Sequence, residues 1–85
     1  MKPVELIYQV DVDAYNHEDN YYGEIVDANT KNLIYSHYNA LKSFAFKEDM
    51  THDLIRKCAE YGYEVVNVID ETNVPSFWEE NIWAF

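Results

Sequence analysis

The densest group of candidate metal ligands is an acidic stretch near the N-terminus. Oxygen atoms of the kind that bind hard cations are supplied there by Asp11, Asp13, Asn16, Glu18 and Asp19. A calcium loop that began at Asp11 would need glycine at its sixth position and glutamate at its twelfth, where this chain has Asn16 and Tyr22. The spacing therefore favours a solvated strand end, and we predict no bound metal.

The nucleophiles and general bases do not form a catalytic pattern. His17, His37 and His52 lack the shared local spacing that would suggest a four-ligand zinc site, and they are predicted to be structural or surface histidines. Cys58, the only cysteine, is predicted to be a small buried hydrophobe rather than a reactive thiol. With two glycines in all, a backbone cradle for phosphate or an oxyanion turn is hard to build. We predict no catalytic residue, no cofactor and no enzymatic activity, although a pair of carboxylates remains an alternative that only three-dimensional separation would reveal.

The charges are distributed unevenly along the chain. Sixteen acids and six bases give a formal net charge of −10. Seven acids and no base lie between Pro3 and Thr30, and six acids and no base lie between Cys58 and Phe85. We therefore expect a strongly negative face, which argues against direct binding of nucleic acid because an acidic surface repels phosphates.

These side chains must be positioned by a small number of elements. Apolar residues fall on every second position from Val4 to Ala14, which predicts a half-buried strand. A polar turn is expected at 16–20, strands at 21–26 and 33–38 joined by a hairpin loop at 27–32, and a turn or single helical turn at 39–46.

The second half of the chain is predicted to contain a helix and a buried strand. Met50, Leu54, Cys58 and Tyr61 have the spacing of an amphipathic helix from about Lys47 to Tyr61, which Gly62 would end. The β-branched run 65–69 is typical of a central strand buried on both faces. A capping box at Ser76 and Glu79 suggests a short final helix rich in aromatic residues, which we expect to pack back on the sheet.

The order of elements predicts one α+β domain spanning residues 1–85. We expect a small antiparallel sheet in β-β-β-α-β order, covered on one face by a helix and followed by a short aromatic C-terminal segment. No stretch approaches the length of a membrane span, the start of the chain does not resemble a signal peptide, and the lone cysteine is typical of a reducing compartment. The predicted location is cytoplasmic.

The acidic N-terminal half is the predicted binding site. Asp11 and Asp13 would project from one strand face about 6.8 Å apart, so a row of carboxylates could imitate a nucleic-acid backbone. Partner-binding residues are predicted to be Asp11, Asp13, Glu18, Asp19, Glu24 and Asp27, with Tyr15 and Tyr21. The hypothesis is a small inhibitor or regulator, of the phage or mobile-element type, that binds a protein with a basic surface such as a nuclease. The alternatives are acids that serve only solubility and a structural homodimer formed through a sheet edge or the aromatic tail.

Overall fold

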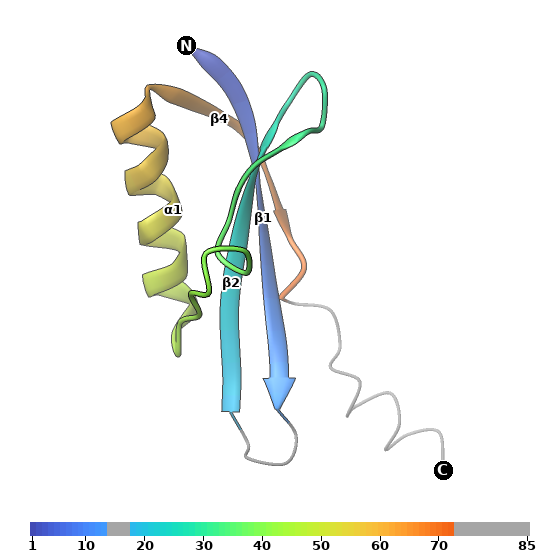
Figure 1. Cartoon of the computed structure of the whole chain (residues 1–85), viewed down its shortest axis with the longest axis vertical. Helices are drawn as coiled ribbons and strands as arrows, with labels where there is room; N and C mark the ends of the chain where they lie inside the picture. The colour runs from blue at the N-terminus through green and yellow to red at the C-terminus, as the bar shows by residue number, and fades with distance from the viewer. Residues whose placement is uncertain (14–17, 73–85) are drawn as a thin grey trace.

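The computed structural model describes residues 1–13 and 18–72 and shows a four-stranded sheet with one helix (Figure 1). The strands are β1 (Lys2–Asp13), β2 (Glu18–Asp27), β3 (Leu33–Ser36) and β4 (Tyr63–Asp70), and the helix is α1 (Lys47–Tyr61). The α+β class, the element order and the helix over one face are as predicted. The predicted C-terminal helix and Tyr15 lie outside the described residues.

The sheet is mixed, which corrects the prediction of an antiparallel sheet. Its order is β3-β2-β1-β4, with β1 and β2 antiparallel and β1 and β4 parallel. β4 runs parallel to β1 because the chain returns from β3 through α1, and such a crossover leaves the following strand in the original direction. β2 also begins at Glu18, so residues 18–20 extend the strand rather than belonging to a polar turn.

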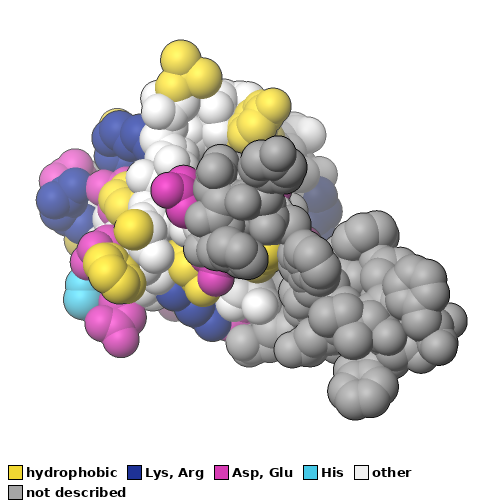
Figure 2. Space-filling view, turned by 90° about the horizontal axis from the view of Figure 1, so that it is seen from below, with side chains coloured by type: hydrophobic (Ala, Val, Ile, Leu, Met, Phe, Trp, Pro, Cys, Tyr) yellow, Lys and Arg dark blue, Asp and Glu magenta, His cyan; other side chains and the backbone are white. Residues whose placement is uncertain are grey.

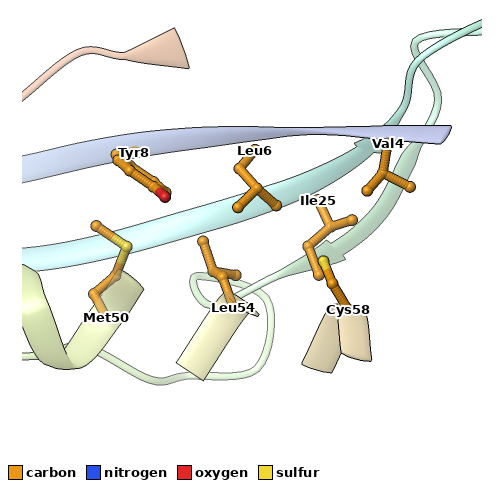
Figure 3. Close-up of a cluster of buried hydrophobic side chains, with 7 residues drawn as sticks. All are labelled: Val4, Leu6, Tyr8, Ile25, Met50, Leu54 and Cys58. Carbon is orange, nitrogen blue, oxygen red and sulfur yellow. The ribbon is translucent and has the colours of Figure 1, made fainter. Parts of the chain in front are cut away.

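The core lies between the sheet and α1 (Figure 3). Val4, Leu6 and Tyr8 alternate along β1 toward the helix, as the sequence predicts, and they meet the buried α1 side chains of Met50, Leu54 and Cys58. Ile25 from β2 completes the cluster. Burial of Cys58 confirms its predicted role as an apolar core residue.

Two backbone features hold α1 in place. Gly62 adopts the left-handed conformation with φ of 72°, and its N–H donates to the carbonyl oxygen of Ala59, so the helix ends where predicted. Position 23 in β2 requires glycine, because the Cβ of any other residue would lie 2.3 Å from Leu54 Cδ1. The absence of that carbon lets the helix approach β2 closely.

β4 is an edge strand, which corrects the prediction of a central one. Its only neighbour in the described sheet is β1. Val65, Val66, Val68 and Ile69 are 37–53% exposed, although their β-branched run is typical of strands covered on both faces. The predicted apolar face of α1 also ends earlier than expected, because its last residue, Tyr61, is exposed, as is Ile55 next to Leu54.

Candidate functional site

Among the described residues, the most deeply buried polar side chain is that of His37, which follows β3 and connects three elements. The Gly23 N–H of β2 donates to His37 Nδ1 over 3.0 Å, and His37 Nε2 lies 2.7 Å from Asp53 Oδ2 on α1. Because Nδ1 accepts a hydrogen bond, the ring proton resides on Nε2 and is donated to Asp53. The other carboxylate oxygen of Asp53 accepts a hydrogen bond from Arg56 Nη2 at 2.7 Å.

This histidine and aspartate have the pairing of a catalytic dyad but serve as a structural connection. Both ring nitrogens are engaged within the protein, so neither is available to take a proton from a substrate. Burial lowers the pKa of His37 below its ordinary value of 6.5, and the hydrogen bond to Asp53 offsets only part of that effect. Burial raises the pKa of Asp53, but the hydrogen bond from His37 and the charge of Lys57 outweigh it and lower the pKa overall. The pair is therefore a neutral imidazole bound to a carboxylate, consistent with the predicted structural role of His37.

The sheet face opposite α1 carries a group of acids around one tyrosine. Register places Gln9 of β1 opposite Tyr22 of β2, and Gln9 Nε2 donates to Glu71 Oε2 at 3.3 Å. Burial raises the pKa of Tyr22, and the negative charges of Asp11, Glu24 and Glu71 raise it further. The register places Asp11 and Glu24 on the same face as Tyr22, and the hydrogen bond from Gln9 holds Glu71 beside them. We call Asp11, Glu24 and Glu71 the open-face acids.

The bases do not neutralise the open-face acids. Five of the bases form ion pairs with other carboxylates. The pairs are Lys2 with Asp27 at 3.5 Å, Lys31 with Glu5, Lys47 with Asp70 at 2.5 Å, and Arg56 and Lys57 with Asp53 at 2.7 and 3.8 Å. Figure 2 shows dark-blue basic and magenta acidic side chains side by side at the left of the molecule. Within the described part of the chain, no lysine or arginine pairs with an open-face acid. The three open-face acids therefore keep their charges without a basic partner among the described residues.

The structure divides the predicted partner-binding residues among different surfaces. Asp11, Glu18 and Glu24 alternate with inward residues and share the open face, whereas Asp19 and Tyr21 pair with Val12 and Val10 and project on the helix side. Asp27 Oδ1 accepts hydrogen bonds from the N–H groups of Asn29 and Thr30, so this carboxylate stabilises the hairpin turn. Asp13 ends β1, and its side chain, like Tyr15, lies outside the described atoms.

A groove lies beside the open-face acids, between the sheet and the loop 38–43. Its volume is about 370 Å³. The sheet contributes Asp11, Asn20 and Tyr22, and the loop contributes Tyr38, Leu41, Lys42 and Ser43. The rings of Tyr22 and Tyr38 are 6.2 Å apart between centroids and tilted by 47°. The groove therefore combines a carboxylate with two aromatic surfaces.

The loop presents its apolar side chains to solvent. Leu41 is 94% exposed and Tyr38 is 72% exposed. Leu41 also has φ of 57°, a left-handed conformation that costs a residue with a Cβ about 1–2 kcal/mol. Both side chains are therefore available for contact with a partner.

Sequence reasoning missed Tyr22, Tyr38, Leu41 and Glu71 as members of the site. Tyr22 could have been found from the period-two alternation with Asn20 and Glu24, two of its neighbours on the predicted strand. No local signal marks Tyr38 or Leu41, because their position over the sheet depends on the path of the loop. Glu71 reaches the site only because β4 lies next to β1.

Comparisons with protein-family models, with curated proteins and with solved structures give no match to this chain. Within residues 1–13 and 18–72, no group of three or more His, Cys, Asp or Glu side chains is arranged to hold a metal ion. No helix in the same residues is long and apolar enough to cross a membrane.

Proposed function

We propose that this protein binds a basic, nucleic-acid-handling protein through its open sheet face and thereby inhibits or regulates it. The proposal is supported by one observation above all: the three open-face acids share the sheet face of Tyr22, and no described base pairs with them. Aromatic and apolar side chains next to acids are what a protein interface with a basic partner requires.

The mechanism is occupation of a positively charged groove that otherwise holds nucleic acid. Asp11, Glu24 and Glu71 pair with lysines and arginines of the partner, while Tyr38 and Leu41 fill the desolvated centre of the interface. The net charge of −10 steers the two proteins together, so association is fast at low salt and slows as salt rises. Competition with nucleic acid follows, because both ligands use the same basic side chains. This role needs no catalytic residue, cofactor or metal and takes place in the cytoplasm.

The test compares two variants that carry the same net charge. The open-face triple variant is Asp11→Asn, Glu24→Gln and Glu71→Gln, and the control triple variant changes Asp19→Asn, Glu48→Gln and Glu60→Gln, acids away from that cluster. Tagged protein is used to capture partners from lysate at about 0.1 M and about 1 M salt, where the Debye length falls from about 10 Å to about 3 Å. A captured nucleic-acid enzyme is then displaced with duplex DNA.

We expect the wild type and the control triple variant to capture the same enzyme at low salt and to lose it to DNA. The open-face triple variant should capture less, because each lost charge slows association and weakens pairing. Equal capture by both triple variants would show that total charge, and not this face, determines binding. If the captured protein stays bound at about 1 M salt and is not displaced by duplex DNA, the proposal is wrong.

A structural homodimer is the second candidate, and the exposed edge strand β4 favours it. The Glu71 N–H donates to Tyr8 O at 2.9 Å, so by alternation Val68 and Asp70 direct their backbone groups away from β1. Proline at position 68 would remove an outward donor without breaking the sheet. Under this reading the wild type is a dimer by light scattering, Val68→Pro is a monomer and Val68→Thr remains a dimer. A wild type that is monomeric at all concentrations would exclude it.

A further inference from the structure

The geometry points to an arginine-binding socket in the groove between the open face and the loop 38–43. This inference rests on the proposed function, because it names the side chain of the basic partner that enters the site. The volume of about 370 Å³ is at the small end of ordinary ligand sites, which span about 300–1,000 Å³. One long side chain is therefore a better match than a whole cofactor.

The lining of the groove fits a cation with an apolar stem. Asp11 supplies a carboxylate from the sheet, and the rings of Tyr22 and Tyr38 supply two aromatic faces tilted by 47°. A cation over such a face is attracted by the negative face of the ring's quadrupole, and the neighbouring Glu24 and Glu71 add to the negative potential. Leu41 offers an exposed apolar surface for the methylene groups of the stem.

Arginine matches this lining better than lysine does. A planar guanidinium can stack on a tyrosine ring and donate two parallel hydrogen bonds to one carboxylate, and it is more weakly hydrated than an ammonium. An ammonium would satisfy Asp11 but would make poor use of the two rings. Arginine is also enriched among the residues that dominate protein interfaces.

Lys42 lines the same groove and limits how many cations can enter. Its ammonium lowers the pKa of both His37 and Asp53, so its charge acts toward the buried pair as well as toward the groove. One lysine stands against three carboxylates, so the local field still attracts a single cation. A second cation would meet the repulsion of Lys42.

The socket is tested with single amino-acid amides, so that no partner needs to be known. The full chain labelled with ¹⁵N is titrated at constant ionic strength with N-acetyl-arginine methylamide, with its neutral citrulline analogue and with N-acetyl-lysine methylamide. We expect saturable shift changes for the arginine amide, with a Kd on the order of 1–10 mM, at the amides of residues 11, 20–22 and 38–43. Citrulline should bind about tenfold more weakly or worse, because it loses the charged hydrogen bonds.

Variants then locate the binding residues. Asp11→Asn should weaken arginine binding about tenfold, and Tyr38→Ala should weaken it about two- to fivefold, the usual range for an exposed cation–ring contact. Glu60→Gln, which makes the same change in charge on α1, should leave the affinity unchanged. Equal affinities for arginine and citrulline, or shift changes that do not saturate, would overturn the socket.

The outcome is separable from that of the proposed function. If the arginine amide saturates the groove but no nucleic-acid enzyme is captured, the socket stands and the proposed function fails. If the open-face triple variant loses a captured enzyme but the arginine amide does not bind, the acidic face docks without this socket.

Discussion

Replacing His37 by phenylalanine tests how much the buried connection between β2 and α1 contributes to stability. Phenylalanine keeps a planar ring in a fully buried site but removes both hydrogen bonds. The Gly23 N–H would then be buried without an acceptor, at a cost of about 1–3 kcal/mol, and Asp53 would lose a charged hydrogen bond worth about 1.5–3 kcal/mol. The expected loss is about 3–5 kcal/mol of unfolding free energy. A domain of this size has about 4–13 kcal/mol in total, so His37→Phe should lose a large fraction of its stability.

Urea unfolding followed by far-ultraviolet circular dichroism measures this loss. With a slope of about 1–1.5 kcal/mol per molar urea, the midpoint should fall by at least about 2 M. His52→Phe is the matched control, because His52 is an exposed imidazole on α1 and the change should cost less than about 0.5 kcal/mol. Asp53→Asn retains an acceptor for Nε2 and should be less destabilising than His37→Phe. A loss below about 1 kcal/mol for His37→Phe would refute the assigned hydrogen-bond network.

Three further outcomes are expected. Because burial lowers the pKa of His37 in the folded state, the unfolded chain takes up a proton first as the pH is lowered, so stability should fall as the pH drops below about 6.5, and this slope should be absent in any folded His37 variant. Gly23→Ala should cost about 1–3 kcal/mol in urea unfolding, because its Cβ would lie 2.3 Å from Leu54 Cδ1; an unchanged midpoint would mean that α1 shifts freely. Leu41→Gly should keep or raise the melting temperature, since it relieves a φ of 57° at an exposed residue, while weakening capture of the partner. A fall in melting temperature would show instead that the Leu41 side chain stabilises the fold.

The local elements were largely predictable from the sequence. Alternation along 4–14 marks β1, and the helical spacing from Met50 to Cys58 with Gly62 after it marks α1 at the bounds the structure has. These predictions succeed because period and end signals depend on neighbours along the chain. The three buried apolar side chains of α1 were predicted for the same reason.

The acidic site was only partly predictable, because charge is visible in a sequence and its distribution over faces is not. Asp11 and Glu24 share a face across two strands because Ile7 pairs with Glu24 in the register of β1 and β2. The same register places Asp19 on the other face. The carboxylate of Asp27 accepts a hydrogen bond from the Asn29 N–H of the hairpin turn. A shift of one residue would exchange these faces, so pairing decides which acids act together.

The sequence by itself determined the element types, the α+β class and the excess of negative charge, since each follows from local pattern or composition. Only the tertiary structure decided that the β-branched run forms an edge strand, that His37 is buried against Asp53, and that Tyr22 shares a sheet face with the open-face acids beside a groove. The physical reason is the same in each case. Long-range pairing and the path of a loop bring together residues far apart in the chain, and such contacts leave no periodic signal in the residues themselves.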